Sequence, residues 1–486
     1  MDERAVRGVP WTLLTYAGNK LFTIATIILL ARLLAPSDFG VMAIAMLMVN
    51  FLGYFGNFGL QATLVLRPAL PMRAKGTLLT MMWVLGAAIA VGLAAASPLL
   101  GDLFEEPELA GVLAAMAATM VFGGPRWFYE SLLQLEYEFR PRFAAQIASS
   151  AVTAGVSIGL ALSGAGVWSL AGGFIAGGLV HTIALIVLAP YRVPLAFDRG
   201  HARNAIKDGS GFVAQGGLQF VQDNADYLVV SRVLGSAQLG YYSMGYRLGE
   251  LPFYGIADPV AKVTFPGFSK MRHLGQDIGP AFLSTLRLVA LVTVPLGVVL
   301  SAGAEPFTRA LYGDKWLPMI GVLGVLGAWG MIRPTHATLG WLLNSIGAAR
   351  LIGVISGITL VVLVPAIVIA ANAGGITAVA GVMLADVTVT TGVLAVFASR
   401  RAGIPVRRQL ETLKPALVAG PVSWIATRGV AEALSGEPPF LALAAVAVTA
   451  LGSFAIVATL VAPGIVKEAM DQAGRTLGRE AAADSN

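Results

Sequence analysis

Residues 211–240, GFVAQGGLQFVQDNADYLVVSRVLGSAQLG, combine the apolar character of a membrane-spanning helix with a set of polar side chains. At 100° per residue the polar side chains fall within about 100° of one another on one helical face. They are Gln215, Gln219, Gln222, Asp223 and Asp226. Because carboxylates in the middle of a membrane are costly unless they meet water or protein, this helix should line a polar cavity.

The same pattern occurs 200 residues earlier, in residues 11–40. Polar groups stand at matching places, and the pairs are Asn19 with Gln219, Thr23 with Asp223 and Thr26 with Asp226. Arg32 and Arg232, Leu34 and Leu234, and Gly40 and Gly240 are identical. A second echo at an offset of 210 matches residues 111–113 with 321–323 and Arg140 with Arg350. The echoes predict an internal repeat of six helices, parallel about an axis along the membrane normal.

Apolar stretches of spanning length recur along the whole chain and predict an all-α polytopic membrane protein with about 14 transmembrane helices. The predicted spans are 11–34, 39–63, 76–99, 110–133, 143–162, 168–189, 210–234, 239–260, 281–301, 318–343, 350–371, 376–398, 413–432 and 440–461. The repeat divides them into an N-terminal lobe (1–200), a C-terminal lobe (201–400), a final helix pair (401–463) and a tail (464–486).

Composition agrees with this pattern, because 56% of the 486 residues are hydrophobic and 12% are charged, with a mean hydropathy of +0.76. Soluble domains carry about 25% charged residues. The longest predicted outer loop, residues 302–317, leaves no room for a soluble catalytic domain. Without cysteine there is no disulfide or thiolate metal site. The first apolar run is too long for a cleavable signal peptide.

Lysine and arginine set the expected orientation. With the N-terminus inside, 23 of the 33 basic residues fall in or beside cytoplasmic segments, and two, Arg309 and Lys315, fall in outer loops. This asymmetry predicts that both termini are cytoplasmic. Since the positive charges are scattered over short loops, the net charge of +6 does not indicate a nucleic-acid partner.

Six stretches resemble the bacterial polysaccharide transporters, the Wzx-type lipid-linked oligosaccharide flippases of the multidrug/oligosaccharidyl-lipid/polysaccharide exporter superfamily. They are ARLLAPSDFGVMAIA (31–45), YESLLQLEYEFRPRF (129–143), SRVLGSAQLGYYSMGYRL (231–248), VTFPGFSKMR (263–272), LYGDKWLPMIGVL (311–323) and LLNSIGAARL (342–351). The resemblance, strongest to colanic-acid exporters, implies two pseudo-symmetric six-helix lobes in a V around a central cavity. It also implies the bacterial inner membrane and an undecaprenyl-diphosphate-linked oligosaccharide cargo.

Such a cargo needs cations for its diphosphate and polar groups for its glycan. Lys20 borders the polar stripe of the first helix, where it contacts cargo or pairs with an acid such as Asp223. Arg126 and Arg333 lie beside prolines in the predicted fourth and tenth helices. Either these arginines donate hydrogen bonds to phosphate at a kinked gate, or the kinks serve helix packing. The other substrate-binding candidates are Arg247, Asn19, Gln215 and Gln219, with Arg247 also able to pair with Glu250.

Three acids lie near the middle of predicted spans, Asp223, Asp226 and Asp386. Each is a candidate for binding a coupling ion, H⁺ or Na⁺, for hydrogen bonding to the glycan, or for a buried salt bridge. Glu130 pairs with Arg126 four residues earlier, and His181 is expected to make a helix–helix hydrogen bond. No phosphate-cradling loop, metal spacing or other cofactor motif occurs.

The leading hypothesis is a flippase for lipid-linked oligosaccharide units in exopolysaccharide or O-antigen assembly, and not an enzyme. Its partners would be the cargo, membrane lipids, and the polymerase and export machinery of the pathway. The alternatives are an ion-coupled multidrug or small-molecule antiporter of the same superfamily, and a membrane-embedded polysaccharide polymerase or ligase. The last of these requires a large outer loop, which the sequence lacks.

Overall fold

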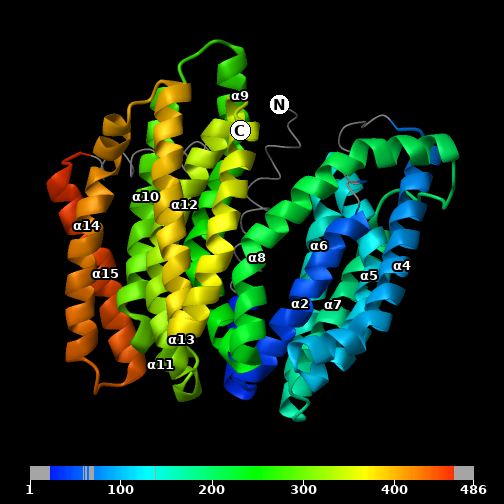
Figure 1. Ribbon diagram of the computed structural model, residues 1–486, viewed down its shortest axis with the longest axis horizontal. Helices are drawn as coiled ribbons and strands as arrows, with labels where there is room; N and C mark the ends of the chain where they lie inside the picture. Colours follow the sequence, from blue (N-terminus) through cyan, green and yellow to red (C-terminus); the bar gives the residue numbers. More distant parts are fainter. Residues whose placement is uncertain (1–21, 58–59, 61–62, 65–69, 137, 465–486) are drawn as a thin grey trace, which may run out of the picture. The chain divides into compact units, whose positions relative to one another are not determined.

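The computed structural model describes residues 22–57, 60, 63–64, 70–136 and 138–464, and every regular element in these ranges is a helix (Figure 1). Contacts divide the chain into two compact units, Met1–Ser243 and Met244–Asn486. The division at residue 200 rests on the repeat, not on contacts, and stays a prediction.

The first unit is built from six helices that follow the predicted spans, together with most of α8. They are Phe22–Leu33, α2 (Pro36–Asn57), α4 (Met72–Phe104), α5 (Pro107–Leu135), α6 (Phe139–Leu162), α7 (Val167–Leu188) and α8 (Arg199–Gly249). Helix α4 packs along α5, α6 packs along α7, and α5 and α7 join the two pairs. Glycines permit the close approach of α4 and α5, since a side chain at Gly86 or Gly124 would overlap the backbone of the facing helix.

The second unit contains the remaining helices. They are a π-helical turn (Phe253–Ala257), α9 (Asp258–His273), α10 (Gly279–Ala302), α11 (Ala304–Leu311), a 3₁₀ turn (Asp314–Met319), α12 (Ile320–Ser345), α13 (Ala349–Ala402), α14 (Val406–Ala433) and α15 (Pro439–Val461). Helix α12 packs against α10 and α13, and α14 and α15 pack together (Figure 1). Trp424 of α14 donates from Nε1 to the hydroxyl of Ser301 on α10 at 3.0 Å. The predicted final helix pair therefore joins the second unit along α10.

Two glycines mark kinks inside the long helices α8 and α13, each of which contains two of the predicted spans. Gly235 in α8 has φ 82° and ψ 175°, and Gly375 in α13 has φ 64° and ψ −155°. Neither conformation is helical, and both lie in regions that favour glycine. The kinks fall between predicted spans 210–234 and 239–260, and between 350–371 and 376–398, so α8 and α13 each contain two predicted segments.

Nine helices in the described residues are long and apolar enough to cross a membrane. The charged helices α8 and α14 are not among them, and of the first span the described part is Phe22–Leu33. With these and the two kinks, the described helices account for the predicted set of about fourteen segments, and the all-α polytopic class is confirmed.

The repeat-related glycines Gly40 and Gly240 meet each other inside the first unit. A side chain at Gly40 would overlap the carbonyl of Ser236, and one at Gly240 would overlap the carbonyl of Pro36. The contact is reciprocal, because Pro36 and Ser236 are also related by the offset of 200 residues. The sequence echo therefore corresponds to a self-complementary backbone contact between α2 and α8.

The predicted outer loop at 302–317 is largely helical, unlike the prediction, and so is the segment 261–280 between the predicted spans 239–260 and 281–301. Helix α11 and the following 3₁₀ turn occupy the outer segment, and α9 occupies much of segment 261–280. Arg309 stabilises α11 by pairing with Glu305 one turn earlier at 3.1 Å and with Asp314 at 2.8 Å. Local ion pairs thus give helical structure to polar segments that the hydropathy pattern assigns to loops.

Candidate functional site

Four of the predicted substrate-binding side chains lie outside the described residues. Lys20 and Asn19 precede residue 22, and the side chains of Gln215 and Gln219, on the first half of α8, are not described. The polar face of this helix is therefore described from Gln222 onward, and the roles of the four residues stay predictions.

Asp226 of α8 is buried, with 1% of its surface exposed, and is fully engaged by neighbours in the first unit. The hydroxyl of Tyr242 donates to Oδ2 at 2.6 Å, and the backbone N–H of Tyr227 donates to Oδ1 at 2.9 Å. In a continuous helix Asp226 and Tyr242 would be about 24 Å apart. Their hydrogen bond therefore joins the two halves of α8 across the kink at Gly235.

Asp223 differs from Asp226, since it is exposed and acts on Asp226 electrostatically. Two carboxylates one helical turn apart, one exposed and one buried, form an acidic pair on the predicted polar face. Their assignment as coupling-ion residues stays a prediction. Tyr242 is a partner that the sequence analysis missed, although a chain reversal near Gly235 would have placed it opposite Asp226.

Arg126 belongs to a cluster of charged residues from three helices of the first unit. Nε2 of His181 on α7 lies 3.6 Å from Oε1 of Glu130 on α5. Arg126 of α5 acts electrostatically on both of these residues, and Arg142 in the first turn of α6 acts on His181. The expected Arg126–Glu130 pair therefore lies next to His181. His181 itself was expected to make a hydrogen bond between helices.

The backbone of α5 and α7 holds this cluster together. Thr182, next to His181, donates to the carbonyl of Phe122 on α5 at 3.3 Å, in the turn before Pro125. The guanidinium of Arg126 lies 5.8 Å from the ring centroid of Trp127. Pro125, which was predicted to kink a gate, thus lies one turn after the residue where α7 is hydrogen-bonded to α5.

Arg333 of α12 lies between two aromatic rings of the second unit. Its guanidinium carbon is 5.0 Å from the ring centroid of Phe253 and 5.1 Å from that of Trp329. It also acts electrostatically on Asp386 of α13. The structure therefore brings together a predicted cargo-binding cation and a predicted coupling-ion acid. The aromatic partners were missed, although Trp329 precedes Arg333 by one helical turn in the sequence.

His336, one turn after Arg333, lies next to two hydroxyl groups of α13. Its Nδ1 lies 3.4 Å from Oγ1 of Thr390 and 3.4 Å from Oγ1 of Thr391. This histidine matches Arg126 at the repeat offset of 210 residues. Both units therefore have a histidine between two packed helices at this level, with a carboxylate partner in the first unit and hydroxyl partners in the second.

Arg247 lies in the last turn of α8, in the second unit, and its side chain is exposed. It acts electrostatically on Tyr312, which directly follows α11 and is buried. Because α11 occupies the predicted outer segment, Arg247 belongs near that end of its unit. Arg232, the residue that the repeat pairs with Arg32, forms an ion pair with Glu105 at 2.9 Å in the first unit.

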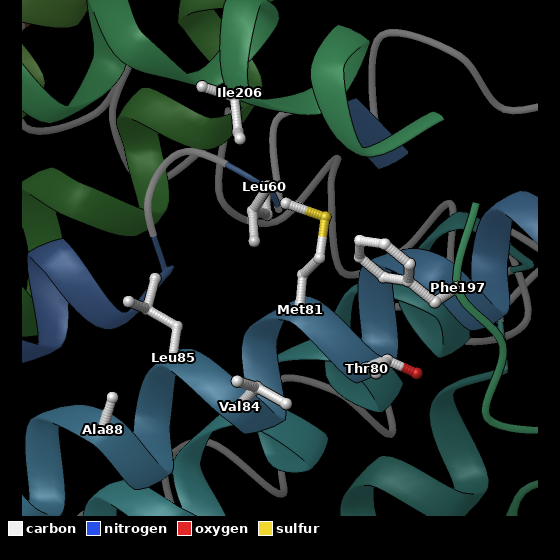
Figure 2. A pocket seen from close by; sticks show the side chains of 8 residues that line it. All are labelled: Leu60, Thr80, Met81, Val84, Leu85, Ala88, Phe197 and Ile206. Atoms are coloured by element: carbon white, nitrogen blue, oxygen red, sulfur yellow. The ribbon is translucent and has the colours of Figure 1, made fainter. Parts of the chain in front are cut away.

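The first unit also contains an apolar cavity of about 360 Å³ (Figure 2). Its lining comes from α4, the start of α8 and the chain after α2, and consists of Leu60, Thr80, Met81, Val84, Leu85, Ala88, Phe197 and Ile206. Such a surface fits hydrocarbon and not a glycan or a phosphate. Among the described residues no group of three or more histidines, cysteines or acids could hold a metal ion.

Comparison with known proteins places the chain in a family. Residues 29–321, more than half of the chain, match the pattern of the polysaccharide biosynthesis protein family. The chain belongs to this family. The succinoglycan biosynthesis transport protein ExoT of Rhizobium meliloti is 27% identical over 70% of this chain and 69% of its own length. The lipopolysaccharide biosynthesis protein WzxC of Escherichia coli is 25% identical over 77% of this chain and 78% of its own length.

Solved structures confirm the fold class. The lipid II flippase MurJ, in an inward closed conformation, matches with a TM-score of 0.78 at 14% identity over 93% of this chain and 99% of its own. A multidrug transporter of the MATE family, in an inward-facing conformation, matches with a TM-score of 0.63 at 15% identity over 79% and 94% of the two chains. The resemblance drawn from six sequence stretches is thus confirmed for the family and the fold.

Proposed function

We propose that this protein is a flippase that moves an undecaprenyl-diphosphate-linked oligosaccharide across the bacterial inner membrane by alternating access. The observation that carries the proposal is that a member of the polysaccharide biosynthesis family has the fold of a lipid II flippase over 93% of its length. The names of the relatives support export of a polysaccharide unit, since ExoT is a succinoglycan biosynthesis transport protein.

Two half-buried cations support an anionic cargo. Arg126 and Arg333 occupy corresponding helices of the two units, and each guanidinium lies beside an aromatic ring. A guanidinium binds phosphate with two parallel hydrogen bonds and stays charged when partly buried. We assign diphosphate binding to Arg126, Arg333 and Lys20, and glycan contacts to the polar face of α8. The protein acts as a transporter and leaves the cargo chemically unchanged.

The distribution of basic residues supports an orientation with both termini in the cytoplasm. In this orientation the cargo is loaded from the face where lipid-linked units are assembled. Coupling to H⁺ or Na⁺ through Asp223, Asp226 or Asp386 would supply the driving force. The polymerase and export proteins of the same pathway are the expected partners after release.

Replacing Arg126 and Arg333 singly by alanine tests the cationic assignment. Each variant should lower polymer export at least tenfold while the amount of protein in the membrane stays unchanged, because each loses a charge-assisted phosphate contact. R428A is a matched control, since Arg428 of α14 pairs with Glu432 at an exposed position. Export at wild-type levels from both variants would exclude these arginines as cargo ligands.

The second candidate, a small-molecule antiporter, is favoured by the fold likeness to the MATE transporter. Reconstituted protein distinguishes the two. A flippase moves a fluorescent undecaprenyl-diphosphate glycan between leaflets of proteoliposomes and does not export cationic dyes. Dye export without glycan translocation would support the antiporter and contradict the flippase.

A further inference from the structure

His181 of α7 is buried against the half-buried Glu130 of α5, and in the described part of the chain the two side chains approach without forming a hydrogen bond. His181 is 7% exposed, and its Nε2 has no hydrogen-bond partner among the described residues. The nearest acidic atom is Oε1 of Glu130 at 3.6 Å. An unsatisfied polar atom at this depth destabilises the fold, so its retention calls for a functional explanation.

The charges around His181 do not balance. Glu130 and Arg126 of α5 and Arg142 of α6 act on it electrostatically, and α2, also packed against α7, supplies none of these groups. Both arginines are permanently charged, so among the described residues the neutral histidine leaves two cations against one carboxylate. Nε of Arg142 is also buried without a hydrogen-bond partner in the described part of the chain. The cluster therefore has room for one more negative charge.

A proton on Nε2 of His181 would complete the contact with Glu130, and an anion beside Arg126 would balance the excess positive charge. Protonated Nε2 would turn the contact with Glu130 into an ion pair, but a third cation is unfavourable while the arginines share one carboxylate. A phosphate bound by Arg126 supplies the missing negative charge. Because each ligand removes the repulsion that opposes the other, their binding must be mutually favourable.

We propose that His181 and Glu130 form a proton-binding site that is filled when a diphosphate binds at Arg126. The proposal rests on the proposed function for the identity of the anion. It places the proton in the first unit, on residues outside the acidic pair of α8 and apart from Asp386. His336, the histidine at the corresponding level of the second unit, has hydroxyl neighbours at Nδ1 and serves as its natural control.

The test measures binding of undecaprenyl diphosphate to the full-length protein in lipid nanodiscs between pH 6 and 8. The diphosphate itself titrates in this range, so the result is the difference between wild type and H181Q. Uptake of one proton by the protein steepens the pH dependence of the affinity by up to about tenfold per pH unit. H181Q should lose this additional slope, and H336Q should keep it.

E130Q provides a second variant that removes the carboxylate while preserving size. It should also lose the additional slope, since the protonated histidine then lacks its counter-charge. Calorimetry in two buffers of different ionisation enthalpy should show up to one more proton taken up by wild type than by E130Q. Equal slopes and equal proton uptake in wild type, H181Q and E130Q would overturn the proton site while leaving the flippase standing. Wild-type protein that fails to bind the probe at any pH would overturn the proposed function and this inference with it.

Discussion

At the scale of single side chains, Asp226, Arg333 and His181 are buried or half-buried polar residues with three different kinds of surroundings. Asp226 receives two hydrogen bonds, Arg333 lies against two aromatic rings, and Nε2 of His181 has no hydrogen-bond partner in the ranges that the structure describes. A satisfied buried group stabilises the fold, whereas an incompletely satisfied one is available to a ligand. This contrast indicates that the hydrogen bonds of Asp226 stabilise the first unit, and that the cluster around His181 is available to a ligand.

Removing the hydroxyl of Tyr242 should destabilise the first unit. In Y242F the buried carboxyl of Asp226 loses a donor at 2.6 Å, which should cost about 1–3 kcal/mol. The measurement is thermal unfolding of the purified protein in detergent. Y54F is the control, since the ring of Tyr54 is 44% exposed and stays in contact with Phe220. Equal unfolding temperatures for Y242F and the control would contradict a structural role for this bond.

Arg333 should not be replaceable by lysine. R333K keeps the positive charge but loses the planar group that lies 5.0 Å from Phe253 and 5.1 Å from Trp329. Polymer export by R333K should therefore fall between those of wild type and R333A. Wild-type export from R333K would show that charge alone is required at this position.

At the scale of whole helices, close packing depends on glycine pairs and on kinks. Gly40 and Gly240 let α2 and α8 approach until backbone meets backbone, and Gly235 turns α8 back on itself. Glu105 and Glu106, between α4 and α5, hold this turn through Arg232 and the N–H of Ser236. The two glutamates between α4 and α5 thus hold the kink of α8 in place.

A methyl group at Gly240 should separate α2 from α8. G240A would overlap the carbonyl of Pro36, which neither helix can relieve by a side-chain rotation, so stability should fall by about 1–3 kcal/mol. G155A on α6 is the matched control, because a Cβ at Gly155 meets no atom within 4 Å. The same thermal unfolding assay compares them, and equal losses in both variants would contradict the backbone contact.

The ion pair between Arg232 and Glu105 should contribute much less. Both side chains are half or more exposed, and exposed pairs contribute about 0–1 kcal/mol. A double-mutant cycle with R232A and E105A should therefore give a coupling within this range. A coupling of several kcal/mol would mean that the turn depends on this charge pair and not on Gly235.

At the scale of the whole molecule, the orientation that the charge distribution predicts can be tested without background labelling. The chain has no cysteine, so any introduced cysteine is the one reactive thiol. D102C at the end of α4 should react with a membrane-impermeant maleimide in intact cells, and N204C at the start of α8 should react only after lysis. Labelling of N204C but not D102C in intact cells would reverse the proposed orientation.

The sequence by itself predicted the helical class, the number and order of the spans, and the family, because these depend on local hydropathy and short motifs. A membrane requires about 20 apolar residues per span, so hydropathy alone locates the helices. It also singled out Gly40 and Gly240 through the repeat. It did not predict α9 and α11, whose polar helices are held by local ion pairs that an apolar pattern does not record.

Only the tertiary structure decided which polar groups meet. Tyr242 reaches Asp226 because Gly235 reverses the chain, and His181 faces Glu130 because α5 and α7 pack side by side. Partners that are 16 and 51 residues apart in the sequence leave no local signal. A helix face shows which side chains share a direction, but the packing of helices determines whether a charge is neutralised, surrounded by aromatic rings, or left to bind a ligand.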